Sequence, residues 1–87
     1  MIMTQEIINE NQLWKTADLA LATAISLFYP IEVIEKTPSS NKGFFLFKRS
    51  EELDALIENY WRGELKIEPQ AYFNQLKIIK VRLYSQE

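Results

Sequence analysis

The clearest hydrophobic pattern in the chain predicts a helix that begins after Ser50 and ends near Gly63. Its apolar residues recur at the spacing of one helix face; they are Leu53, Leu56, Ile57, Tyr60 and Trp61. Ser50 is a candidate N-cap, and two glutamates follow it where the helix dipole favours negative charge. Gly63 suits a left-handed C-terminal cap. The spacing favours a core position for Trp61, and the alternative is an exposed aromatic anchor for a partner.

Two further segments have helical apolar spacing. Between Thr16 and Pro30, apolar residues fall around most of the helix circumference, which predicts a central helix covered on several sides. Thr16 is its candidate cap, and Pro30 marks its end. A last helix opens at Glu68, with Pro69 in its first turn. The expected core stripe of that helix is Tyr72, Phe73, Leu76, Ile79 and Leu83, with Ile78 and Val81 left on other faces.

A β-hairpin is predicted between the first two helices. Residues 31–36 are rich in β-branched side chains, and a polar loop separates them from an apolar run of four residues. Because side chains alternate along a strand, Phe45 and Phe47 share one face, which we assign to the core. Phe44 and Leu46 point the other way. A hairpin is not easily covered on both faces in a small domain, so these two are expected either under the last helix or on a partner surface.

These elements together predict one small α+β domain. The expected order is helix, strand, strand, helix, a short strand considered at residues 65–67, and helix, with the hairpin packed against the helices. Residues 1–13 lack a firm period and are treated as an N-terminal arm that can add a short strand, which leaves residues 14–87 as the single domain. A chain of 87 residues is of the size that forms one compact core.

Composition narrows the chemistry. The chain has no Cys, which excludes disulfides, thiolate metal sites and cysteine nucleophiles, and it has no His, the usual proton-transfer group near neutral pH. We therefore expect no enzyme, no cofactor and no metal site. The carboxylates of the second helix are expected on a solvated face: Glu51, Glu52, Asp54 and Glu58. Without a signal peptide or an apolar stretch long enough to span a bilayer, we expect a cytoplasmic protein with no membrane partner.

Charge is arranged in blocks within a net charge of −2. Residues 36–50 hold four cations and no anion. With the outward pair of the hairpin, these cations form the expected partner-binding set: Phe44, Leu46, Lys36, Lys42, Lys48 and Arg49. If the last helix lies beside the hairpin, its cations join a second set, the candidate nucleic-acid contacts: Lys42, Lys48, Arg49, Lys77, Lys80 and Arg82. The acidic total favours an ordinary solvated surface over phosphate contacts.

The hairpin also matches part of a nucleic-acid motif. Lys42, Gly43 and Phe44, with further aromatics after them, follow the strand pattern in which RNA-recognition domains stack bases on exposed rings. Phe45 occupies a position that this pattern reserves for glycine or alanine, and the later aromatics are spaced one residue short. The match is therefore partial.

Four stretches of sequence resemble, in their order and spacing, a family catalogued as domain of unknown function 5659. They are residues 15–22, 43–47, 60–65 and 80–85. The family is uncharacterised, so the resemblance implies no activity and no site residue. Its similarity to phage and mobile-element proteins implies an accessory role, in defence, counter-defence or element maintenance.

We therefore expect a non-enzymatic binding module that acts through protein–protein contacts. The expected setting is an accessory or regulatory subunit of a nucleic-acid-processing, defence or counter-defence complex, related to phage or mobile elements. Its partner is expected to be another protein or a second copy of the chain. The alternative is direct nucleic-acid binding by the basic aromatic hairpin and the last helix.

Overall fold

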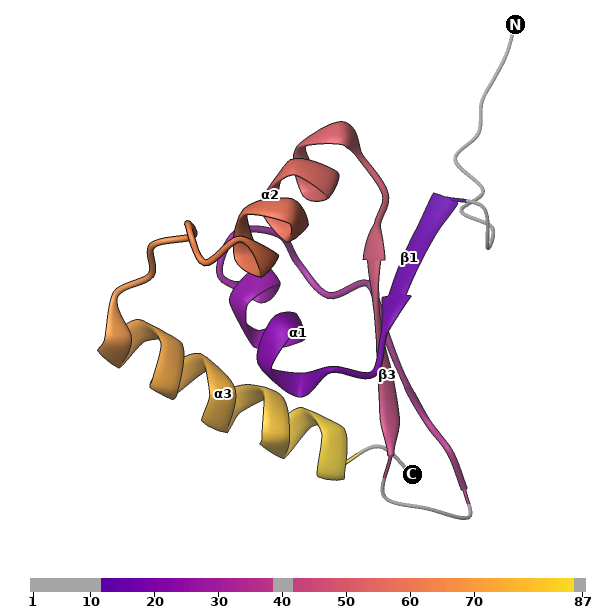
Figure 1. The fold of residues 1–87 in the computed structure, drawn as a ribbon. Helices are drawn as coiled ribbons and strands as arrows, with labels where there is room; N and C mark the ends of the chain where they lie inside the picture. The colour runs from indigo at the N-terminus through magenta and orange to yellow at the C-terminus, as the bar shows by residue number, and fades with distance from the viewer. Residues whose placement is uncertain (1–11, 39–41, 86–87) are drawn as a thin grey trace, which may run out of the picture.

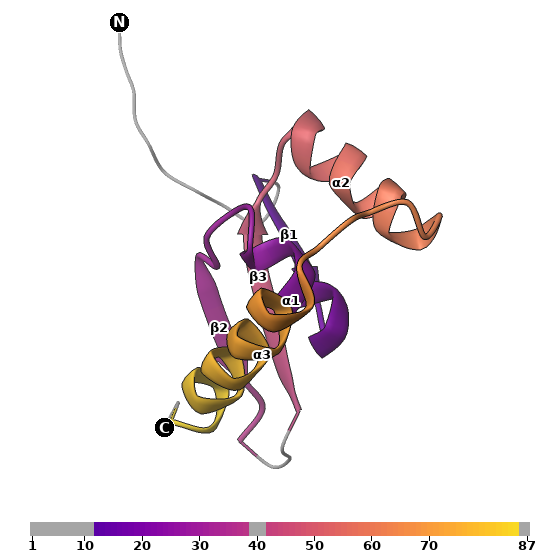
Figure 2. The same cartoon turned by 90° about the vertical axis from the view of Figure 1, so that its left-hand side faces the viewer.

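A computed structural model describes residues 12–38 and 42–85 of the chain. The elements follow in the order β1 (Leu13–Thr16), α1 (Leu19–Ser26), β2 (Val33–Lys36), β3 (Gly43–Lys48), α2 (Glu51–Trp61) and α3 (Pro69–Tyr84). The strands form one antiparallel sheet, and the helices lie together on one face of it (Figures 1 and 2). The predicted fold class, a small α+β domain with a hairpin packed against helices, is confirmed.

β3 is the central strand of the sheet, which has the order β1-β3-β2. On one side Trp14 pairs with Phe47, and on the other Ile34 pairs with Phe45. The third strand of the sheet is therefore β1, which precedes α1 in the sequence. Residues 65–67, considered above for a short strand, have no regular secondary structure, because they cross from α2 to α3 far from the edges of the sheet (Figure 1). Most of the predicted arm, residues 1–11, lies outside the described residues.

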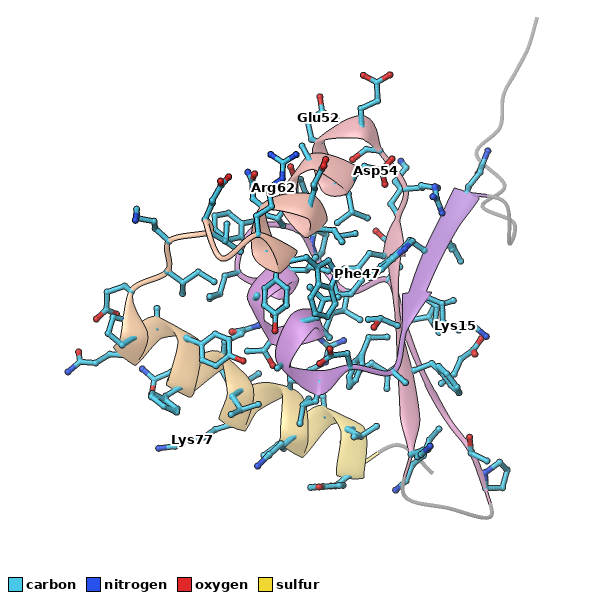
Figure 3. All side chains as sticks on the ribbon, in the orientation of Figure 1. Lys15, Phe47, Glu52, Asp54, Arg62 and Lys77 are labelled. Carbon is cyan, nitrogen blue, oxygen red and sulfur yellow. The ribbon has the colours of Figure 1, made fainter. Side chains whose placement is uncertain are left out.

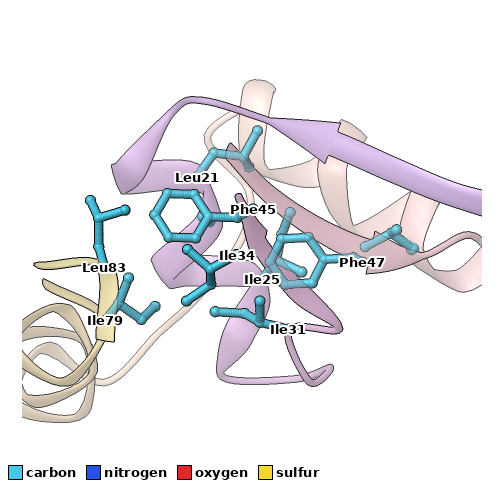
Figure 4. Packing of buried hydrophobic residues seen from close by; sticks show 10 residues of the cluster. Leu21, Ile25, Ile31, Ile34, Phe45, Phe47, Ile79 and Leu83 are labelled. Carbon is cyan, nitrogen blue, oxygen red and sulfur yellow. The ribbon is translucent and has the colours of Figure 1, made fainter. Parts of the chain in front are cut away.

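The core lies between the sheet and the helices. Phe45 and Phe47 are buried at its centre, as the alternation of the hairpin predicts. α1 supplies five consecutive buried residues, which confirms a helix covered on several sides. α3 closes the core with Ile79 and Leu83 (Figure 4). The buried cluster consists of Leu21, Ala22, Ile25, Ile31, Ile34, Phe45, Phe47, Leu53, Ile79 and Leu83.

The first helix is shorter than the sequence pattern predicts. Thr16, expected as the helix cap, ends β1, and its hydroxyl accepts a hydrogen bond from the Asp18 backbone N–H at 3.1 Å. Asp18 is the N-cap instead, because its carboxylate accepts from the Leu21 N–H at 3.1 Å. The helix ends at Ser26, before Pro30. Pro30 has no backbone N–H to donate to the Ser26 carbonyl, and in a helix its ring would clash with that carbonyl, so the helix does not continue past Ser26.

The caps of the other two helices agree with the sequence. Ser50 caps α2 through its hydroxyl, which accepts from the Leu53 N–H at 3.0 Å. Glu68 caps α3 by accepting from the Ala71 N–H at 2.7 Å, and Pro69 stands in the first turn. α3 is joined to α1 by a hydrogen bond from the Tyr72 hydroxyl to a backbone carbonyl at 3.2 Å. These contacts fix one face of α3 against the domain.

Candidate protein-binding surface

The outward pair of the hairpin is covered within the domain, and not by the last helix. Leu46 is only 6% exposed and Phe44 is half-buried. Their face of the sheet is crossed by Lys15, whose Nζ lies 3.4 Å from Glu35 Oε1 and 4.9 Å from the centre of the Phe44 ring. Lys15 lies on the side of the sheet away from the helices (Figure 3). The alternative of burial under α3 is wrong, because α3 packs against the opposite face through Ile79 and Leu83.

The four cations of residues 36–50 do not gather into one rim. Lys36 and Lys42 flank the end of the hairpin, and the Nζ of Lys36 lies 6.0 Å over the ring of Tyr84 in α3. Lys48 and Arg49 lie at the other end of β3, about 17 Å away for a strand of six residues. There they line a depression together with Glu32. The predicted partner-binding set is therefore divided between two ends of the sheet.

The exposed face of α3 is the apolar surface that the sequence analysis missed. Seven large apolar side chains are more than a third exposed among the described residues, and four of them are on this helix. These four define what we call the α3 face: Phe73 at 60% exposure, Ile78 at 51%, Val81 at 67% and Tyr84 at 58%. A shallow apolar depression on the same face is lined by Lys77, Ile78, Val81 and Arg82.

The expected core stripe of α3 is wrong at Phe73. Adjacent residues in a helix point about 100° apart, and α3 packs against the core on one side only, through Ile79 and Leu83, so Tyr72 and Phe73 do not both face inward. Tyr72 is the inward one: its hydroxyl is held by the Ala20 carbonyl. Ile78 and Val81, expected on faces other than the core stripe, are exposed.

Trp61 is also exposed, contrary to the position that its helical spacing favours. It lies in the last turn of α2 with 63% of its surface accessible, while Tyr60 packs against the core cluster. The two rings meet edge to face, 5.0 Å apart. The stripe of α2 therefore ends at Tyr60, and the alternative of an exposed aromatic side chain holds.

Two tyrosines of the domain have raised pKa values. The acidic side chains of α2 are exposed, as expected, and no group of three or more metal-ligating side chains comes together in residues 12–38 and 42–85. Burial raises the pKa of Tyr72, with smaller contributions from Tyr60 and Asp18. Burial and Asp18 also raise the pKa of Tyr60. Both phenols therefore stay neutral at physiological pH.

Cations lie within and beside the α3 face, and the same helix has no carboxylate. Lys77, Lys80 and Arg82 are exposed, and residues 69–85 contain no Asp or Glu. Lys77 projects away from the core (Figure 3). In the part of the chain that the structure describes, none of these three cations forms an ion pair. The face is thus an apolar strip with unneutralised positive charge.

The fold and this surface describe a small α+β domain with an amphipathic outer helix. A family model described as "Domain of unknown function (DUF5659)" matches residues 11–85, and the chain belongs to this family. This confirms the resemblance drawn from the four sequence stretches. Comparisons with curated proteins and with solved structures give no match. Among the described residues, no helix has the length and apolar character needed to cross a membrane.

Proposed function

We propose that this protein is a non-enzymatic binding module that acts through protein–protein contacts, and that the α3 face is its docking surface. One observation carries the proposal: four large apolar side chains stay exposed on a helix whose other face is fixed in the core. Contiguous exposed apolar surface on a small domain is typical of an interaction site. The anchored inner face of α3 makes this surface preformed, which lowers the entropic cost of binding.

The α3 face replaces the outward face of the hairpin as the candidate surface. Leu46 is buried and Phe44 lies beneath Lys15, so neither offers the accessible area that a partner needs. Val81, by contrast, is the most exposed of the large apolar side chains in the described residues. We propose an accessory or regulatory role in a larger complex. A nucleic-acid-processing or defence complex is the setting that the family resemblance suggests.

Direct nucleic-acid binding is the second candidate, and the position of Lys36 favours it. Lys36 over Tyr84 shows that the hairpin end and α3 adjoin, so their cations share one side of the molecule. Lys48 and Arg49 lie too far along β3 to join them. Two of the four residues of the α3 face, Ile78 and Val81, are aliphatic, and aliphatic side chains do not stack on bases as aromatic rings do. A protein partner therefore makes use of more of the exposed side chains of the α3 face than a nucleic acid would.

A photo-crosslinking residue placed at position 81 tests the proposal in the native host. Val81 is exposed, so the substitution leaves the core intact. We expect irradiation to give a discrete adduct that a protease degrades and a nuclease does not. The matched control is the same residue at Glu52, which is exposed and lies on the far side of the molecule from Lys77 (Figure 3). Equal adducts from both positions, or none from position 81, would contradict the proposal.

A further inference from the structure

We propose that the partner of the α3 face is an acidic amphipathic helix, in which carboxylates border an apolar ridge. This inference rests on the proposed function and names the chemistry of the partner at the same surface. It follows from the shape of the face, from its charge, and from the occupants that these two features disfavour.

The shape of the α3 face suits a helix. Phe73, Lys77 and Val81 follow one another at every fourth residue and therefore form one ridge along α3. Tyr84 extends the ridge to about 16 Å, three turns of helix. Ridges of this kind pack into the grooves of a second helix. The shallow depression beside Lys77 and Val81 gives the partner's side chains a place to enter.

The charge of the face favours carboxylates on the partner. Lys77 lies within the ridge, between Phe73 and Val81, while Lys80 and Arg82 border it. Lys36 adds a fourth cation over the ring of Tyr84. No carboxylate is present from Pro69 to Ser85 to neutralise them. Opposite charges on a partner would orient it on the face and speed its association.

The central position of Lys77 disfavours a lipid surface. A membrane-binding helix keeps its cations at the border of the apolar face, where they reach the headgroups. A bilayer that took up Phe73 and Val81 would also enclose the ammonium group between them, at a cost in desolvation. A protein can place a carboxylate against the same group.

A second copy of the chain is also a poor occupant. Two α3 faces packed together would set the same cations against each other. The acidic helix α2 has the right charge, but Glu52 and Asp54 lie on the side of the molecule away from Lys77 (Figure 3). An α2-to-α3 contact would therefore be head-to-tail, and such a contact extends into a ring or an open chain of copies. A different protein can bind the α3 face without causing further copies of the chain to associate.

Selection from an unbiased library of helical peptides tests the inference on the purified full chain. The wild type would be the bait, and Val81→Asp the counter-selection that removes peptides bound elsewhere. We expect the enriched peptides to carry apolar residues at every third or fourth position, bordered by Glu or Asp. For these peptides, Lys77→Glu should weaken binding about tenfold, because it replaces an attraction with a repulsion. Circular dichroism would confirm that each variant is folded.

The matched control is Lys66→Glu, which changes the net charge equally at an exposed position outside α3. It should leave the affinity for the peptides within about twofold of the wild type. Equal weakening by both variants would overturn the inference, because the effect would then come from total charge.

The outcomes separate this inference from the proposed function. Enriched peptides that depend on Val81 but are basic or uncharged would overturn the acidic partner and keep α3 as the docking surface. Binding to phosphatidylserine vesicles or duplex DNA that is lost in Val81→Asp would overturn it in favour of a lipid or a nucleic acid. No enrichment, together with no photo-adduct at position 81, would overturn both proposals.

Discussion

Gly43 in β3 lies against the side chain of Leu83, near the end of α3. A Cβ atom at this position would overlap Leu83 Cδ1 and would lie 3.3 Å from the Glu35 carbonyl oxygen. Gly43 has no positive φ, so the glycine is required for space and not for an unusual backbone conformation. One missing methyl group thus allows Leu83 to enter the core beside β3.

Gly43→Ala should lower the free energy of unfolding by about 1–3 kcal/mol, because Leu83 must move to admit the added methyl group. Urea unfolding of the purified chain measures this loss. In a Leu83→Ala background the same substitution should cost less, since the space is then free. An equal cost in both backgrounds would show that the close approach to Leu83 is not the cause.

Single residues also show where sequence reasoning reached its limit at the candidate surface. Tyr72 and Phe73 are both large and aromatic, and periodicity alone allowed both in one stripe. The hydroxyl of Tyr72, held by the Ala20 carbonyl, decides which of the two faces inward. That partner is 52 residues away in the sequence and leaves no local signal.

Among the elements, α2 is the one whose sequence defines it most completely. Its apolar spacing, its serine cap and its terminal glycine are all local features, and each appears in the structure. Gly63 adopts a φ of 74°. Its N–H donates to the Tyr60 carbonyl at 3.1 Å, and the Glu64 N–H donates to the Asn59 carbonyl at 2.9 Å. These two hydrogen bonds form the C-terminal cap that is typical of a helix followed by a residue in the left-handed conformation, here Gly63.

Replacing Gly63 by alanine should cost about 1 kcal/mol of stability. The space around it is open, because no atom lies within 4 Å of an added Cβ, so the loss would come from the backbone conformation alone. Thermal unfolding followed by circular dichroism would measure it. Gly63→Asn should cost less than Gly63→Ala, since asparagine tolerates the left-handed region better. The reverse order would exclude the backbone as the cause.

β1 is the element that the sequence did not define. Four residues are too few for a reliable alternation, and Lys15 is a residue type that is less common in strands. The strand forms because β2 occupies only one edge of β3. On the other edge, Trp14 pairs with Phe47. The short strand considered at residues 65–67 had a similar pattern but has no neighbouring strand. Strand pairing, which is not local, decided between them.

At the scale of the whole molecule, the three helices meet around Asp18, Tyr60 and Tyr72. Asp18 caps α1, while the two tyrosines come from α2 and α3. Burial raises the pKa of each tyrosine, and the carboxylate of Asp18 adds to the effect. The junction therefore couples the packing of the helices to the protonation of two phenols.

This coupling predicts a loss of stability at alkaline pH. A raised pKa in the folded state means that the unfolded state loses its phenol proton first, near pH 10. The stabilisation that each raised phenol pKa gives the folded state is complete below that pH. It is lost as the pH rises through the folded-state pKa. Tyr72→Phe should cost about 1 kcal/mol near pH 7 through its hydrogen bond to Ala20, and should then lose less stability above pH 10 than the wild type. Urea unfolding over a pH series measures both effects, and parallel curves would contradict the coupling.

The distribution of charge shows why the candidate surface could not be placed from sequence alone. Neighbouring cations in residues 36–50 suggested one patch, but β3 separates Lys42 from Lys48 by its own length. The cations of α3 were known from the sequence, yet their association with exposed Ile78 and Val81 depends on which face the core takes. Packing of Ile79 and Leu83 against the sheet settles that choice.

The central position of β3 also has a consequence for the order of folding. β2 joins it through a short loop, whereas β1 must close a much longer one that includes all of α1. Loop closure costs entropy before its contacts form, so the β2–β3 hairpin is expected in the transition state and β1 is expected to dock after it. During synthesis, β1 and α1 leave the ribosome before any strand is available to pair with them. The earliest part of the domain to be made would therefore be among the last to become ordered.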